Sequence, residues 1–204
     1  MIALNIYLVF LTAYFLASYN SLQNDIKKFR KDNLINLLSA TIKQISINIF
    51  IVYPGILLVF FNFTIYSNEF KFIKFIFDLF FNNYVYDCIL YVIHKNIHKY
   101  FFEIHKKRHD ILITAGFTVF YANSIDFILI NIIPLYTGLI LVNANIYVYY
   151  FHIFVDTYLL VYGSSRIGKR ASFYDYHNRY FFSNYGIDMF MDKYFETYFT
   201  TIPL

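Results

Sequence analysis

The chain has little cysteine and little charge. Cys88 is the only cysteine among 204 residues, so the sequence offers neither an intramolecular disulfide framework nor a cysteine-based zinc site. We interpret Cys88 as a small apolar residue within a helix. Charged residues make up only 15% of the chain, whereas 59% of its residues are hydrophobic and its mean hydropathy is +0.48. This composition excludes an ordinary soluble domain and indicates a polytopic membrane protein.

Three further absences narrow the class. No basic residue precedes the apolar run at 2–19, so we interpret this run as a first membrane helix and not as a cleavable signal peptide. No internal repeat or pair of broken helices supports a small channel or transporter. No surface combining basic and aromatic residues suggests a nucleic-acid partner, so the net charge of +4 is better explained by topology and anionic lipid head groups.

The hydropathy pattern predicts an all-α fold, a polytopic helical bundle in the membrane. A helix needs roughly 20 apolar residues to cross ~30 Å of hydrocarbon. Segments close to this length lie at 2–19, 47–66, 73–93, 113–135 and 139–162, which makes five crossings the simplest count. We expect a short turn around Pro134 to Gly138 to join the last two crossings as an antiparallel hairpin.

The basic residues predict one shared membrane face for three regions of the chain. Of the 17 basic residues, only Lys71 and Lys74 fall outside the ranges 20–46, 94–110 and 163–204. With five crossings these three ranges lie on the same side, and the excess of positive charge in cytosolic loops places that side in the cytosol. We therefore expect a multi-pass protein of an endoplasmic reticulum-type membrane with its histidine-rich face in the cytosol.

Four of the six histidines fall within 16 residues, as two pairs in which the histidines are four positions apart. His94 and His98 form the first pair, and His105 and His109 form the second. This spacing places two imidazoles over one spot on a helix, and neutral imidazole nitrogens suit iron, zinc or copper. On one straight helix the midpoints of the two pairs would be about 16 Å apart. A shared metal site therefore requires the chain to bend between Lys99 and Ile104.

The ordered motifs resemble those of the membrane-bound fatty acid hydroxylase and sterol desaturase superfamily, whose members are non-haem di-iron oxygenases with histidine boxes. The resemblance covers about 87–197. The motifs, in chain order, are Asp87-x3-Tyr91-x2-His94-x3-His98, His105-x3-His109-Asp110, Tyr121-Ala122-Asn123-Ser124-Ile125-Asp126, Tyr174-Asp175-Tyr176-His177-Asn178, and Asn184-Tyr185-Gly186 followed by Asp192 and Thr197.

The chain also departs from the family pattern at positions where further histidines are expected. The residues found there instead are Arg108 in the second box, Asn123 after Tyr-Ala, and Tyr174 and Asn178 in the third box, and Tyr158 in the last membrane helix is a candidate replacement for one more. Carboxylates at Asp110 or Asp175 would be substitute ligands, because ferrous iron accepts oxygen donors.

The resemblance implies a site, a reaction and partners. The expected metal ligands are His94, His98, His105, His109 and His177, and they would hold iron, as a complete or incomplete di-iron centre, with zinc as a surrogate. Asp87 would accept a hydrogen bond from a ligating imidazole and so orient it for catalysis. The chain would use O2 to hydroxylate or desaturate a sterol or fatty acyl lipid, with cytochrome b5 or a reductase as electron donor.

The same resemblance divides the chain into two parts and leaves other functions open. Residues 1–72 would form N-terminal membrane helices with a basic cytosolic loop, and residues 73–204 would form the hydroxylase-like domain. The depleted boxes also suit a catalytically degenerate relative that binds lipid or supports membrane structure. The spacing of His105 and His109 allows an intramembrane metallopeptidase, but Lys106 stands where that class needs a glutamate as general base. The remaining histidine, His152, we expect to pair with Asp156 as a packing feature.

Overall fold

The computed structural model is built from helices and describes the chain apart from residues 30, 64–65, 68, 166–171, 188 and 200–204. The side chains of residues 63 and 172–175 are also left undescribed. The elements in chain order are α1 (Ile2–Lys28), α2 (Lys31–Ile47), η1 (Asn48–Val52), α3 (Tyr53–Phe63), α4 (Phe72–Tyr100), α5 (Phe102–His109), η2 (Gly116–Phe120), α6 (Ser124–Phe127), η3 (Ile128–Ile132), α7 (Ile133–Leu141), α8 (Ile146–Ser164), α9 (Ser172–Tyr180) and α10 (Phe190–Tyr194). No strand occurs in the described residues, so the predicted all-α fold is confirmed.

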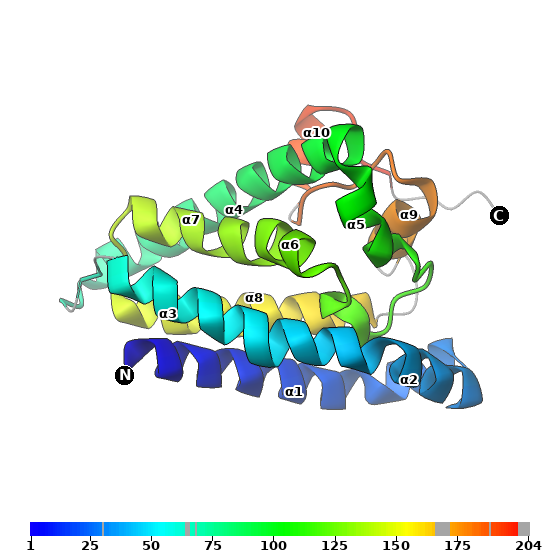
Figure 1. The fold of residues 1–204 in the computed structure, drawn as a ribbon. Coiled ribbons are helices and arrows are strands. Elements are labelled where there is room, and N and C mark those ends of the chain that lie inside the picture. Colours follow the sequence, from blue (N-terminus) through cyan, green and yellow to red (C-terminus); the bar gives the residue numbers. More distant parts are fainter. Residues whose placement is uncertain (30, 64–65, 68, 166–171, 188, 200–204) are drawn as a thin grey trace.

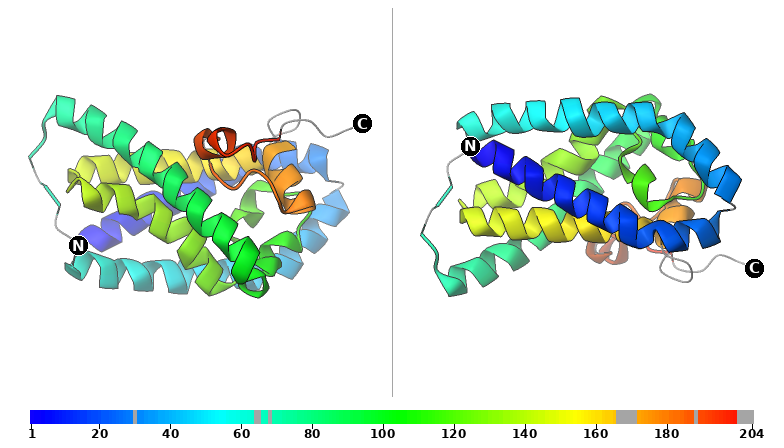
Figure 2. Two further views of the ribbon diagram at one scale, coloured as in Figure 1. Left: turned by 90° about the horizontal axis from the view of Figure 1, so that it is seen from above. Right: turned by 90° about the horizontal axis from the view of Figure 1, so that it is seen from below.

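Long helices run back and forth along one axis (Figures 1 and 2). Four of them are long and apolar enough to cross a membrane, namely Ile2–Lys28, Lys31–Asn62, Phe72–Tyr100 and Ser124–Leu141. The fifth predicted crossing corresponds to α8, which packs along α1 but is less apolar because it carries His152, Asp156 and several tyrosines. A membrane-spanning helical bundle therefore fits the chain, and the crossing by α8 stays a prediction.

Two π-helical turns allow prolines to stand inside continuous helices. η1 joins α2 to α3 just before Pro54, and η3 joins α6 to α7 just before Pro134. A proline has no N–H and its ring collides with the preceding turn, and a widened π turn relieves this conflict. At η1 the extra room also holds the Asn48 amide, which donates hydrogen bonds of 2.9 Å to the carbonyls of Phe120 and Ala122.

The structure corrects two predicted boundaries of the last crossings. The turn expected at Pro134 to Gly138 lies inside α7, and the real turn covers residues 142–145, where Asn143 adopts a positive φ of 47°. Gly138 serves close packing, because a Cβ there would come within 2.9 Å of the Asn82 Cα of α4. The segment 113–135 becomes α-helical only at Ser124, where the Asn123 side chain caps the Ile125 N–H. The preceding residues form a loop that contains the short 3-10 helix η2.

One end of the bundle gathers the basic and histidine-rich parts of the chain, and we call it the histidine end. It contains the α1–α2 connection, α5 and α9, whereas the N-terminus and the α7–α8 turn lie at the opposite end (Figure 1). The described basic residues Lys27, Lys28, Lys106 and Lys107 are at the histidine end, and Lys71 is at the other. The positions of these residues therefore agree with the predicted membrane face shared by the basic regions of the chain. Arg30, Arg166, Lys169 and Arg170 lie outside the described residues.

His152 has the structural role expected of it. Its Nδ1 lies 2.6 Å from Asp156 Oδ2, one turn later on α8, and its Nε2 contacts the Asn82 amide of α4. His152 is buried among α4 and α8 residues and belongs to a different part of the bundle from the other histidines.

Candidate metal centre

A bend in the chain brings the two early histidine pairs together. α4 ends at Tyr100, α5 begins at Phe102, and Phe101 between them has φ −136° and ψ 34°, outside the helical range. The predicted bend between Lys99 and Ile104 is therefore confirmed. It folds α5 back so that His94 Nε2 lies 3.1 Å from His105 Nε2, and His98 Nε2 lies 3.2 Å from His109 Nε2.

His177, from α9, completes the cluster although it is far from the others in sequence. Its ring centroid is 4.4 Å from that of His94 and 5.1 Å from that of His109. His94, His98, His105 and His177 each present a nitrogen within 4.8 Å of the others, and this group is able to bind a metal ion. His109 lies beside it, with a ring centroid 4.8 Å from that of His105. The structure thus brings together all five histidines that the sequence suggested as ligands.

Hydrogen bonds fix which nitrogen of three imidazoles faces the cluster. The Nδ1 atoms of His94 and His177 lie 2.8 Å and 2.5 Å from the carbonyl oxygens of Tyr185 and Ser183. A carbonyl only accepts, so each Nδ1 carries the proton and each Nε2 keeps a free lone pair. His105 Nδ1 is held in the same way by Asp126 Oδ1 at 2.6 Å. These three Nε2 atoms are therefore oriented as metal donors.

Burial keeps these imidazoles neutral. Desolvation and the neighbouring histidines lower the pKa of His109 to about 2 and hold the pKa of His177 well below its usual value. Desolvation also lowers the pKa of His105, although the hydrogen bond to Asp126 opposes it. Only a neutral imidazole has the lone pair that a metal needs. In addition, His177 Nε2 is buried without a hydrogen-bond partner, which costs free energy unless a ligand satisfies it. The donor set therefore fits a metal such as iron or zinc.

Asp87 has a different place from the one expected of it. Its two carboxylate oxygens accept hydrogen bonds of 2.8 Å and 2.9 Å from the backbone N–H groups of Ile187 and Met191. Asp192 in turn accepts from the N–H of Tyr185 at 2.9 Å. These bonds hold the loop whose Tyr185 carbonyl orients His94. The orientation of His94 thus comes from a backbone carbonyl, and Asp87 supports the loop that provides it.

Asp126 and Arg108 form an ion pair beside the cluster that the sequence motifs did not predict. Asp126 is fully buried and shares its carboxylate between His105 and Arg108, whose Nε lies 3.1 Å from Asp126 Oδ2. The guanidinium also donates to the Val119 carbonyl at 3.1 Å and to Asn131 Oδ1 at 2.8 Å. A carboxylate within an apolar segment is a signal for such a partner, because an unpaired charge there is costly. Which residue pairs with Asp126 depends on how α5 packs against α6, and this packing is seen only in the structure.

Asp110, one of the two proposed substitute ligands, does not belong to the cluster. Asp110 is exposed at the end of α5, and the ligand group contains only imidazoles among the described side chains. Tyr158 accepts a hydrogen bond of 2.9 Å from the Asn20 amide of α1, and Asn178 donates to the Ile111 carbonyl at 3.0 Å. The side chains of Tyr174 and Asp175 lie outside the described part of the chain.

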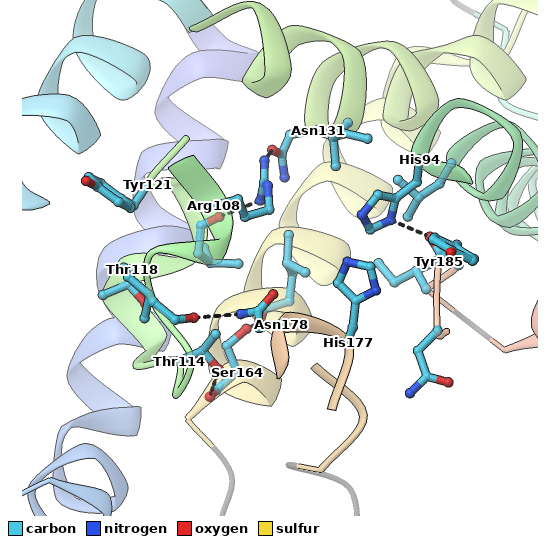
Figure 3. Close-up of a pocket in the computed structure, with 18 of the residues that line it drawn as sticks. His94, Arg108, Thr114, Thr118, Tyr121, Asn131, Ser164, His177, Asn178 and Tyr185 are labelled. Atoms are coloured by element: carbon cyan, nitrogen blue, oxygen red, sulfur yellow. Dashed lines mark hydrogen bonds between the residues drawn. The ribbon is translucent and has the colours of Figure 1, made fainter. Parts of the chain in front are cut away.

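A cavity adjoins the centre. It encloses about 740 Å³, counted with its open mouth, and its wall includes His94, His177 and Arg108. Figure 3 shows the two imidazoles side by side at one edge of this space, with Thr118 and Tyr121 across from them. A second cavity of about 310 Å³ shares Tyr86, Asn131 and Leu160 with the first and extends between α1, α3, α7 and α8.

Comparisons with known proteins found no match: no family model, no curated protein and no solved structure is significantly similar to this chain.

Proposed function

We propose that the chain is a membrane-bound lipid hydroxylase or desaturase-like oxidoreductase that uses a non-haem iron centre and O2. The observation that carries this proposal is the meeting of five neutral, buried histidines at the edge of a cavity within a membrane-type bundle. The ordered motifs from Asp87 to Thr197 supply the reaction class. In hydroxylation one oxygen atom enters a C–H bond and the other leaves as water. In desaturation two hydrogen atoms leave the lipid and both oxygen atoms leave as water. Each reaction takes two electrons and two protons from a donor.

The residues around the cavity suit a lipid chain. Leu90, Ile111, Val119 and Leu160 give this cavity an apolar wall, which suits the hydrocarbon part of a lipid. A bound metal supplies the oxidising chemistry, and the chain's own contribution is to hold the substrate beside His94 and His177.

The basic residues at the histidine end bear on the location of the centre and on its electron supply. Basic residues at the histidine end support a cytosolic location for this face in an endoplasmic reticulum-type membrane. A positively charged surface also suits an acidic electron donor such as cytochrome b5, or a reductase domain, which would approach the centre from the same side.

The test compares lipids from cells that produce the wild-type chain with lipids from cells that produce a His94→Ala, His98→Ala double variant. His152→Gln is the matched control, because it removes the one histidine outside the cluster. We expect oxidised lipid with the wild type and the control, and its loss with the double variant. Identical lipid profiles in all three would contradict the oxygenase and favour a lipid-binding or structural protein that keeps the same scaffold.

A further inference from the structure

The four grouped donor nitrogens of the centre lie close enough together to surround one metal ion. Four histidine nitrogens fall within 4.8 Å of one another. Metal–nitrogen bonds are about 2.0–2.1 Å long, so donors on opposite sides of one ion are about 4.2 Å apart. Two ions about 3.5–4 Å apart would spread their outer donors over a much longer distance. The cluster therefore has the size of a single coordination sphere.

The nearby buried carboxylates are already committed to other partners. Anionic ligands offset the mutual repulsion of two divalent ions, which is about four times that of two unit charges at the same distance. Asp126 shares its two oxygens between His105 and Arg108. Asp87 and Asp192 accept hydrogen bonds from backbone N–H groups with both of their oxygens. Among the described side chains, no carboxylate belongs to the ligand group.

Arg108 brings a permanent positive charge to the place where a second ion would need ligands. Arg108 directly precedes His109 in the sequence. Its side chain is only 15% exposed, and its guanidinium donates hydrogen bonds to three acceptors. Through Asp126 the guanidinium is connected to His105, which is itself in the cluster. A fixed cation at this point repels a second metal ion and offers it no donor atom.

We propose that this centre holds one metal ion, and that the Arg108–Asp126 ion pair takes the place of a second ion and its ligands. The proposal rests on the proposed function only in assuming a metal at the histidine cluster. It departs from the di-iron centre that the sequence motifs suggested. The ligands of the single ion are His94, His98, His105 and His177, with His109 beside them as a fifth donor.

The test is a count of cobalt ions bound to the full chain. Purified protein in mild detergent is loaded with excess Co²⁺ and desalted, and the bound cobalt is measured by mass spectrometry and by electron paramagnetic resonance. We expect one ion per chain with the spectrum of an isolated ion, no ion in the His94→Ala, His98→Ala variant, and one ion in the His152→Gln control. Two magnetically coupled ions would overturn this inference and leave the proposed function standing. No specific binding would overturn both.

A second comparison tests whether the charge of Arg108 limits the number of bound ions. Arg108→Lys keeps the positive charge, and Arg108→His removes the permanent charge and adds a donor next to His109. We expect one ion per chain in the lysine variant and a higher count in the histidine variant, with both eluting as the wild type does in gel filtration. An unchanged count in Arg108→His would overturn the role given to Arg108.

Discussion

The ion pair between Asp126 and Arg108 is expected to stabilise the fold as a unit, so its two members should not be separable by mutation. Asp126→Asn leaves the Arg108 guanidinium mostly buried, with only the neutral acceptors Val119 and Asn131. Removing one partner of a buried ion pair costs about 3–5 kcal/mol. Because Arg108 keeps two hydrogen bonds and 15% exposure, we expect the lower end, about 3 kcal/mol, or a loss of about 6–12 °C in Tm for a chain of this size.

Removing Arg108 instead of Asp126, or removing both residues, tests the same coupling between them. Arg108→Gln leaves a fully buried carboxylate beside His105 and should cost a similar amount. The double variant buries no uncompensated charge, so its cost should fall short of the sum of the two single costs by about 1–3 kcal/mol.

The free energies are measured on metal-free protein with a chelator, by unfolding in increasing mole fractions of dodecyl sulfate and following helicity by circular dichroism. Keeping metal out separates the ion pair's effect on the fold from its effect on metal binding. If the two single costs simply add, within about 0.5 kcal/mol, Asp126 and Arg108 are not coupled and the reasoning about this pair is refuted.

Three further results are expected. Gly138→Ala should destabilise the bundle by about 1–3 kcal/mol, because the new Cβ would meet Asn82, whereas Gly55→Ala, with no atom within 4 Å, should be neutral or slightly stabilising in the same unfolding assay. Asp87→Ala should weaken cobalt affinity about 10- to 100-fold in equilibrium dialysis, because the loop that orients His94 loses its support; an unchanged affinity would show that this support is dispensable. The pKa of His109 is lowered to about 2, so an unfolded chain, with a pKa near 6.5, binds this proton more readily than the folded chain does. Stability of the metal-free protein should therefore fall as the pH drops below about 6.5, by about 1.4 kcal/mol per pH unit for this histidine, and a flat profile between pH 6.5 and 5 would contradict the buried neutral imidazole.

The sequence was sufficient to predict the apolar helices and the meeting of the two early histidine pairs because both depend on local spacing, whereas His177 was included only through the resemblance. The apolar segments have the length of membrane helices, and the four-residue spacing of each pair fixes its helical face, so the need for a bend near Phe101 followed from distance alone. The boundaries at Pro134 and Ser124 were wrong for a related reason. A proline is tolerated after a π turn, and a π turn is produced by tertiary packing and leaves no simple pattern in the sequence.

The orientation of the histidines was beyond prediction because it comes from backbone carbonyls and from distant elements. The Tyr185 and Ser183 carbonyls orient His94 and His177, and a carbonyl belongs to every residue type. Asp87 was expected to orient a ligating imidazole, but its carboxylate accepts hydrogen bonds from the loop that α4 contacts. The first histidine after it on its own helix, His94, is seven residues away, which is about 10 Å along the axis. Spacing identifies which side chains share a face of a helix, whereas the acceptors behind them depend on what packs against that face.

The dependence on distant acceptors has a physical consequence for the centre. His94, His105 and His177 receive their orienting bonds from two places: the 183–187 loop for His94 and His177, and α6 for His105. The loop is in turn held by Asp87 of α4, and α6 is held by Arg108 of α5. The donor geometry therefore forms only when α4, α5, α6 and the C-terminal loop are packed together, because each imidazole is fixed by an element other than its own. Burial also removes the alternative of protonated, water-bound histidines, so assembly of this end of the bundle and formation of the metal site are expected to be one cooperative event.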